Sequence, residues 1–198
     1  MIVILAKAPE PGRVKTRLIP ALGAERAAAL CHAMSDDVIA TVQSLGVPWR
    51  LAVDGAAHPW EGLPVEAQAQ GDLGERLKHA LRGGGIAIGT DAPTLSAAYI
   101  RRAFTELAHA DVVFGPAFDG GYVLVGVRPD ALAVFDDIPW STEETLAVSV
   151  EHARDVGLTV SLLDFWYDVD ALEDLVFLRN QLRILGPHVA TRTRAALG

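Results

Sequence analysis

The sequence predicts an α/β protein, a three-layer α/β/α sandwich in which helices cover both faces of a mainly parallel β-sheet. Short apolar runs bounded by proline and glycine recur along the chain, as is typical of strands in the interior of a parallel sheet. Between these runs lie segments whose apolar residues recur every three or four positions, which is the spacing of amphipathic helices. Because the two kinds of segment alternate, the strands are expected to be joined mainly by helices.

The composition fits one globular domain spanning residues 1–198. With 51% apolar and 21% charged residues, the chain has an ordinary globular balance and enough length for a substantial core. The formal net charge of −8 argues against a general nucleic-acid-binding protein. The single cysteine, Cys31, excludes a disulfide framework and a cysteine metal site. No apolar run has the length of a membrane span and no signal-peptide pattern is present, so we expect a cytoplasmic protein with no membrane partner.

In the first half of the chain, the pattern predicts strands and helices in alternation. An apolar run at residues 2–6 is the first expected strand, and a loop rich in proline and cations follows it. Apolar spacing predicts a long helix over residues 27–45 that ends at Gly46. After it we expect a strand at residues 49–53, a loop at 54–63, a helix at 70–81 and a strand at 86–88.

In the second half, the segment at residues 89–96 is expected to turn into a helix with Ser96 as its N-cap. A short loop separates the strands expected at residues 111–114 and 122–127, so the second of these strands should run antiparallel to its neighbours. Ser141 and Glu144 have the spacing of a capping box, which predicts a helix start. The remaining expected elements are strands at residues 111–114, 122–127 and 158–165, and helices that begin near Ala171 and His188.

The loop after the first strand concentrates positive charge in an otherwise acidic chain. Four cations crowded into one loop repel one another unless an anion lies among them. Two prolines and Gly12 shape this loop, which favours a defined anion-binding loop over a solvated basic connection. We therefore predict a phosphate-binding loop that uses Lys7, Arg13, Lys15 and Arg17.

Acidic residues follow three later strands of the expected sheet. In open α/β sheets, ligands bind outside the carboxyl ends of the strands. A hard cation such as Mg²⁺ is bound by one or two carboxylates together with phosphate oxygens of the substrate. The pattern predicts a Mg²⁺ (or Mn²⁺) site facing the basic loop, with Asp91, Asp168 and Asp170 as the candidate ligands and Asp119 as a candidate catalytic acid or base.

Each of these acids also has a purely structural interpretation. Asp91 suits a turn before a helix. Asp119 precedes two glycines and suits a hairpin turn. Asp170 suits a helix N-cap, with Glu173 at capping-box distance. Taken one at a time these interpretations are as good as the functional one, but three acidic sites after three strands, together with a cationic first loop, favour a metal and phosphate site.

A second loop carries a weaker ligand-binding signal. Gly71 would let the backbone approach a flat ligand closely, and Gln70 and Arg76 could contact phosphate or ribose. The alternative is an ordinary helix start capped by Asp72. Both interpretations remain open for this loop.

Common catalytic patterns are absent from the chain. No G-x-G-x-x-G follows the first strand, and the first loop lacks the glycine and lysine spacing of a P-loop. Neither G-x-S-x-G nor H-E-x-x-H occurs. Covalent catalysis by serine, cysteine or histidine therefore has no support in the sequence.

Five motifs resemble the bacterial DUF2064 family: AKAPEPGRVKTRL, GTDAPTL, GPAFDGGYVLVGV, WST and DVDALEDL. That family belongs to the nucleotide-diphospho-sugar transferase superfamily, which is glycosyltransferase-A-like and includes molybdenum-cofactor and 2-phospho-lactate guanylyltransferases. The resemblance extends from residue 1 to about residue 185. It implies a Rossmann-like sandwich that binds a nucleotide over the strand ends.

By position, the resemblance implies that the four cations of the first loop bind the nucleotide phosphates. It also implies that Asp91 and Asp170 coordinate the metal. The chain departs from the superfamily at two places. Ala171 and Leu172 stand where sugar-activating relatives have Thr-Pro, so the turn there is expected to differ. Glycosyltransferases usually carry D-x-D after the middle strand, whereas Asp91 is the single acid here.

The leading functional prediction is a Mg²⁺-dependent nucleotidyltransferase. A small phosphorylated or phosphonate acceptor would attack the α-phosphorus of a nucleoside triphosphate, while Lys15, Arg13 and Arg17 hold the pyrophosphate that leaves. The alternatives are a glycosyltransferase that uses a nucleotide sugar, with Asp119 deprotonating the acceptor, and a non-catalytic nucleotide-binding module. Four cations suit a triphosphate better than the diphosphate of a nucleotide sugar.

Overall fold

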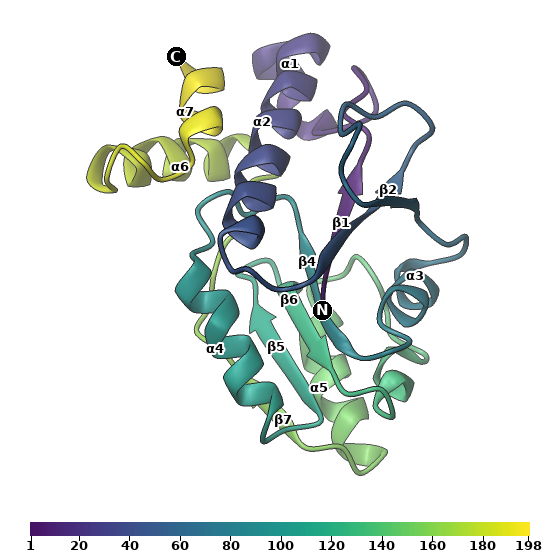
Figure 1. Ribbon diagram of the computed structural model, residues 1–198. Helices are drawn as coiled ribbons and strands as arrows, with labels where there is room; N and C mark the ends of the chain where they lie inside the picture. Colours follow the sequence, from purple (N-terminus) through teal and green to yellow (C-terminus); the bar gives the residue numbers. More distant parts are fainter.

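The computed structural model describes residues 1–198 and is built on a seven-stranded sheet in the order β3-β2-β1-β4-β6-β5-β7 (Figure 1). All neighbouring strands are parallel except β6, which runs antiparallel to β4 and β5. This confirms the predicted mainly parallel sheet and the reversed strand within it. The strands are β1 (Ile2–Lys7), β2 (Trp49–Asp54), β3 (Val65–Ala67), β4 (Gly85–Gly89), β5 (Val112–Pro116), β6 (Tyr122–Val127) and β7 (Val160–Leu162).

Helices cover both faces of the sheet, as the sequence predicts. On one face, α2 (Ala24–Gln43) and α4 (Ala97–Leu107) pack against a cluster of strand side chains. On the other face, α3 (Leu73–Ala80), α5 (Thr145–Asp155) and the short helix η2 (Leu132–Phe135) bury a second cluster. The strand β1 lies in the middle and is buried on both sides, since Ile2 and Ile4 belong to the first cluster and Val3 to the second. This position explains why β1 is an uninterrupted apolar run.

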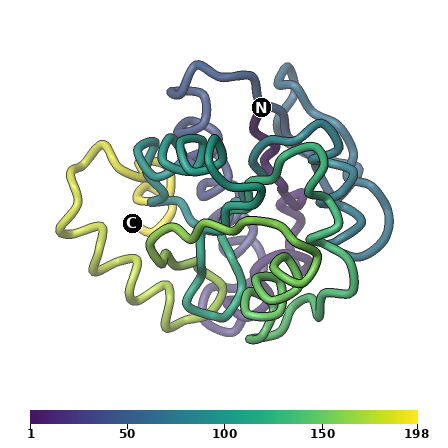
Figure 2. The backbone as a smooth tube through the Cα atoms, turned by 90° about the horizontal axis from the view of Figure 1, so that it is seen from below, coloured from purple at the N-terminus to yellow at the C-terminus, as the bar shows by residue number.

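A third cluster holds the C-terminal helices α6 (Leu172–Ile184) and α7 (Thr191–Leu197) against α2. These helices lie beside the body of the molecule, whereas the N-terminal strand runs through its middle (Figures 1 and 2). The short helices η1 (Thr16–Leu18) and α1 (Ile19–Leu22) join the same cluster through Leu18, Ile19 and Leu22. None of the helices combines the length and the apolar character needed to cross a membrane.

Several predicted boundaries are wrong in the structure. The helix α5 starts at Thr145 with Glu144 as its N-cap, not at Ser141, whose φ of 63° lies in the left-handed region. The carbonyl of Pro139 accepts hydrogen bonds from the hydroxyls of Thr142 and Thr145, which form a separate turn before the helix. The strand predicted at 158–165 is reduced to the three residues of β7 at the sheet edge.

The strand β3 has no counterpart in the sequence prediction. It is three residues long, and so short a strand shows no recognisable alternation of apolar and polar residues. It pairs with β2 at the edge of the sheet.

The buried acid Asp37 attaches α7 to α2. Its carboxylate oxygens accept hydrogen bonds from the backbone nitrogens of Arg192 and Thr193 at 3.2 and 2.8 Å. The chain turns into α7 through Ala190, which has a φ of 50° and cannot cap the helix with its own side chain. An acid on α2 therefore satisfies the free N–H groups at the start of α7, where negative charge is also favoured.

We expect Asp37→Ala to lower the free energy of unfolding by about 1–3 kcal/mol, because it leaves two backbone donors unpaired, one of them buried. Urea unfolding measures this loss, and limited proteolysis should show faster cleavage near residues 186–191. Asp37→Asn keeps one acceptor and should lose less. Equal stability of all three proteins would mean that Asp37 does not hold α7.

Candidate functional site

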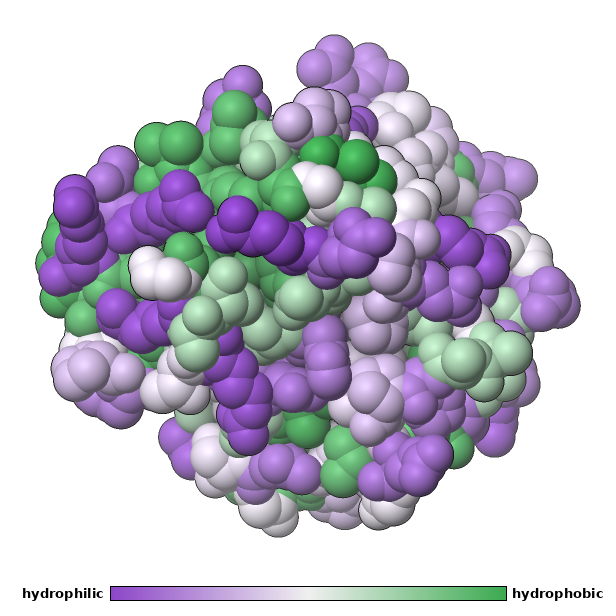
Figure 3. All heavy atoms as spheres, turned by 90° about the horizontal axis from the view of Figure 1, so that it is seen from above, coloured by the Kyte–Doolittle hydropathy of each residue, from purple (hydrophilic) through white to green (hydrophobic).

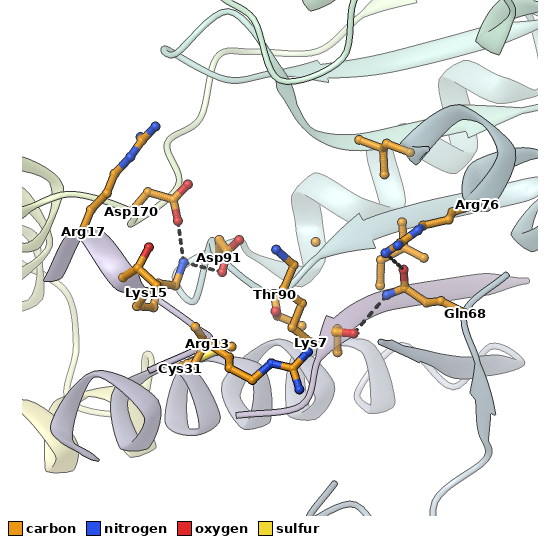
Figure 4. Close-up of a pocket in the computed structure, with 16 residues that line it drawn as sticks. Lys7, Arg13, Lys15, Arg17, Cys31, Gln68, Arg76, Thr90, Asp91 and Asp170 are labelled. Carbon is orange, nitrogen blue, oxygen red and sulfur yellow. Dashed lines mark hydrogen bonds and ion pairs between the residues drawn. The ribbon is translucent and has the colours of Figure 1, made fainter. Parts of the chain in front are cut away.

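The carboxyl ends of β1, β4, β5 and β7 meet at one edge of the sheet, because these strands are mutually parallel. Figure 3 looks onto this edge and shows a belt of hydrophilic side chains across it, beside apolar patches. A cavity of about 340 Å³ opens here. It is lined mainly by the loop after β1, the start of the loop after β4, Asp170, and the segment around α3 (Figure 4).

The basic loop is anchored at its base and strained at Lys15. Val14 packs with Ala28 and Cys31 of α2, and Leu18 is fully buried. Lys15 has a φ of 46° and a ψ of 43°, a left-handed conformation that costs a residue with a side chain about 1–2 kcal/mol. Such strain persists only where the surrounding structure imposes it. Here it aims the Lys15 side chain into the cavity (Figure 4).

At one end of the cavity, Lys15 lies between two carboxylates. Its Nζ donates to Oδ1 of Asp91 at 2.5 Å and to Oδ1 of Asp170 at 2.7 Å. The Lys15 side chain is only 4% exposed, whereas those of Asp91 and Asp170 are 44% and 43% exposed. Burial alone would lower the pKa of Lys15, but the two carboxylates outweigh it and raise the pKa above its usual value. Lys15 therefore remains a cation at neutral pH.

Backbone contacts bring these two acids together from distant parts of the chain. Asp91 lies just beyond β4, and its carbonyl accepts a hydrogen bond from the backbone nitrogen of Val169 at 2.9 Å. This bond places Asp170, the next residue, beside Asp91. Asp170 does not serve as the N-cap of α6 with Glu173 as its partner, as its structural interpretation would require. The N-cap is Ala171, and Asp174 accepts from the backbone nitrogens of Asp170 and Ala171 at 3.1 and 2.8 Å.

At the other end of the cavity, Arg76 is held in a fixed position. Its Nε donates to the carbonyl of Gly71 at 3.1 Å, and its Nη1 donates to Asp54 at 3.0 Å and Gln68 at 3.2 Å. The Nη2 group makes no hydrogen bond within the protein, so its two donors are free for a ligand. Asp72 caps α3 by accepting from the backbone nitrogen of Glu75, as the structural interpretation of this loop predicts.

Sequence reasoning missed Gln68 and named Gln70 in its place. Gln68 lines the cavity and Gln70 does not, while Gly71 lines a neighbouring cavity of about 440 Å³. The Gln68 side-chain nitrogen donates to the carbonyls of Ala6 and Ala52, both at 3.0 Å, so its oxygen must face Arg76. Its position directly after β3 is the signal that points to it, but a strand of three residues has no recognisable sequence pattern.

The other three cations of the first loop, Lys7, Arg13 and Arg17, also line the cavity. Arg13 forms an exposed ion pair with Glu10 at 3.0 Å, which is weak enough to exchange for a phosphate. The buried Cys31 contributes to the wall. Burial, followed by the charge of Asp91, raises the pKa of its thiol to about 11, so Cys31 is not a thiolate nucleophile at neutral pH.

Asp119 and Asp168 lie outside the cavity wall. Asp119 accepts a hydrogen bond from the backbone nitrogen of Gly121 at 2.9 Å, as expected for its structural interpretation as a turn residue. Asp168 is partly buried near three other acids. Burial and the charges of Asp119 and Asp170 raise its pKa to about 6.

The donor set at Asp91 and Asp170 fits a hard divalent cation. The two carboxylates already share a cation in the form of the Lys15 ammonium, and both are open to solvent. No group of three or more His, Cys, Asp or Glu side chains is arranged to bind a metal alone, and Asp168 as a third ligand stays a prediction. Two carboxylates suit Mg²⁺ or Mn²⁺ only if water and ligand phosphate complete the coordination.

Known proteins resemble this chain in sequence and in fold. Residues 29–142 match the family described as "Uncharacterized protein conserved in bacteria (DUF2064)". A 2-phospho-L-lactate guanylyltransferase of Methanothermobacter thermautotrophicus is 29% identical over 177 residues, covering 81% of this chain and 76% of its own. A candidate nucleotide-diphospho-sugar transferase from Desulfovibrio desulfuricans G20 is 31% identical, with a TM-score of 0.91 over 99% of this chain and 92% of its own.

A more distant solved structure shares the fold alone. Rv0371c of Mycobacterium tuberculosis H37Rv is 18% identical, with a TM-score of 0.58 over 91% of this chain and 98% of its own, and it has also been solved in complex with manganese. Together these relatives confirm the predicted glycosyltransferase-A-like α/β fold and the predicted transferase class.

We expect Asp168→Asn to stabilise the protein at pH 8 and to have no effect near pH 4. The folded state raises the pKa of Asp168 from 3.8 to about 6, so stability is lost as the pH rises between these two values, and the full loss persists at higher pH. The gain should be about 1–2 kcal/mol after allowance for partial exposure.

Thermal unfolding of both proteins between pH 4 and pH 8 measures this difference. Asp130→Asn is the matched control, because Asp130 is exposed and forms no ion pair. A stability difference that is the same at every pH would contradict the raised pKa of Asp168.

Proposed function

This chain belongs to the DUF2064 family of bacterial proteins, and on that premise we propose that it is a Mg²⁺-dependent nucleotidyltransferase. It would transfer a nucleoside monophosphate from a nucleoside triphosphate to a small phosphorylated or phosphonate acceptor. The observation that carries the proposal is the single cavity that collects the cations of the first loop, Asp91 and Asp170. The 29% identity to a guanylyltransferase supports it.

In this proposal the cavity would bind the parts of a nucleoside triphosphate at separate places. Lys7, Arg13 and Arg17 supply positive charge for the phosphates without a buried ion pair that would have to be broken. Arg76 presents two free donors at the far end, where they could bind the ribose or an acceptor atom of the base. Gln68 and Asp54 keep this guanidinium in place, so it would bind without losing much side-chain freedom.

The reaction forms one bond between an oxygen of the acceptor and the α-phosphorus and breaks the bond from that phosphorus to the β-phosphate. An acceptor phosphate or phosphonate is already anionic, so the attack needs no general base. The cationic loop stabilises the charge that develops on the departing pyrophosphate, and catalysis is by positioning and electrostatics. A Mg²⁺ ion held by Asp91 and Asp170 would supply further neutralisation of phosphate charge.

A glycosyltransferase is the second candidate. The 31% identity to a candidate nucleotide-diphospho-sugar transferase favours it. It would need a base near the acceptor, and Asp119, the residue predicted for that role, lies outside the cavity and accepts a hydrogen bond from its own turn. The nucleotidyl proposal needs no such base and is therefore preferred.

The first test is a thermal-shift panel of the four nucleoside triphosphates and several nucleotide sugars, each with and without Mg²⁺. We expect one triphosphate to raise the melting temperature in a Mg²⁺-dependent way, because a ligand that binds only the folded state stabilises it. Pyrophosphate release in the presence of 2-phospho-L-lactate, phosphoenolpyruvate or methylphosphonate then measures transfer. A shift with a nucleotide sugar alone, and no pyrophosphate release, would support glycosyl transfer instead.

Asp91→Asn and Asp170→Asn should each reduce pyrophosphate release by about 100-fold or more, as expected when a group that stabilises transition-state charge is removed. Asp130→Asn is the matched control and should retain full activity, because this exposed residue is not part of the cavity. If Asp91→Asn binds the triphosphate as tightly as the wild type does, and if neither the wild type nor Asp91→Asn releases pyrophosphate, the chain is a nucleotide-binding module and not an enzyme.

A further inference from the structure

The structure places the Lys15 ammonium between Oδ1 of Asp91 and Oδ1 of Asp170, the two carboxylates proposed to hold the metal. The roles proposed above require Asp91 and Asp170 to hold a divalent cation and Lys15 to face phosphate. In the structure, however, both carboxylates already share the Lys15 ammonium, at 2.5 and 2.7 Å (Figure 4). An ammonium group and a metal ion cannot both sit at hydrogen-bonding or coordination distance between the same two oxygens.

We propose that Lys15 is the resident cation of this site in the free protein and that a divalent metal replaces it only when phosphate is bound. This inference rests on the proposed function for the identity of the ligands. Lys15 would then have two positions: between Asp91 and Asp170 in the free protein, and against the phosphates in the loaded one.

The charges explain why binding of the metal and binding of phosphate are linked. Two carboxylates and one ammonium leave a net charge of −1, so the free site is nearly balanced. A divalent metal on the two carboxylates balances them completely and leaves the Lys15 ammonium without a partner. The Lys15 side chain is 4% exposed, and an unpaired buried charge is strongly unfavourable. A phosphate group supplies the missing anion, so metal and phosphate should each strengthen the binding of the other.

The exposures of the three side chains show how the exchange could take place. Asp91 and Asp170 are each more than two-fifths exposed, so a hydrated metal can reach them without displacing the fold. Lys15 sits in the same loop as Arg13 and Arg17, which attract the phosphate to its side. A short movement of one flexible side chain, with no movement of the backbone, would therefore be enough.

The test is Mn²⁺ binding to the intact protein, measured by electron paramagnetic resonance with and without pyrophosphate and corrected for Mn²⁺ bound by pyrophosphate alone. We expect pyrophosphate to strengthen Mn²⁺ binding by about 10- to 100-fold, within the usual range for coupled sites. Lys15→Met should bind Mn²⁺ at least about tenfold more tightly than wild type without pyrophosphate, and pyrophosphate should then strengthen binding less than it does in the wild type, because only its direct coordination of the metal remains.

Lys7→Met is the matched control, because it removes the same charge from the same cavity but from a lysine that forms no ion pair with Asp91 or Asp170. Without pyrophosphate it should change Mn²⁺ affinity about two- to threefold at most, as expected of a screened charge that lies farther away. Asp91→Asn should abolish tight Mn²⁺ binding with and without pyrophosphate.

Equal Mn²⁺ affinity with and without pyrophosphate in the wild-type protein would overturn the proposal, and so would a Lys15→Met protein with unchanged affinity. The wild-type comparison can still overturn the proposal if Lys15→Met fails to fold. None of these measurements requires turnover. A protein that shows the coupling but transfers no nucleotide would sustain this inference and refute the proposed reaction.

Discussion

The contact of one buried lysine with two carboxylates organises the functional edge of this protein. Lys15 is 76 residues from Asp91 and 155 residues from Asp170 in the chain, so this group closes the largest loops in the site. It holds together the segments that follow β1, β4 and β7. The hydrogen bond between Val169 and Asp91 carries the same connection through the backbone.

This arrangement depends on the sheet beneath it. Parallel strands end at the same edge, so three loops that are distant in sequence start close together there. The two apolar clusters on either side of the sheet make β1 and β4 rigid, and the left-handed backbone of Lys15 is tolerated on that rigid support. The strain is local, and it sets the direction in which the lysine points.

The two ends of the cavity differ in how firmly their cations are held. Arg76 has three acceptors in the protein, and Gln68, which supplies one of them, is itself fixed by the carbonyls of Ala6 and Ala52. Lys15 has only the two carboxylates, which are also the groups a divalent metal prefers. A rigid end can select one part of a nucleotide, whereas an exchangeable end can respond to phosphate and metal.

The sequence by itself determined the fold class, the reversed strand and most of the segments that line the cavity, because apolar periodicity and the cationic first loop are local properties of the chain. It also named Lys15, Asp91 and Asp170 as candidate site residues. Only the tertiary structure decided that these three pair with one another, that Gln68 lines the cavity in place of Gln70, and that Asp119 and Asp168 lie outside it. Pairing between residues more than 70 positions apart, and the pairing of a three-residue edge strand, depend on how the strands are ordered in space, which spacing along the chain does not encode.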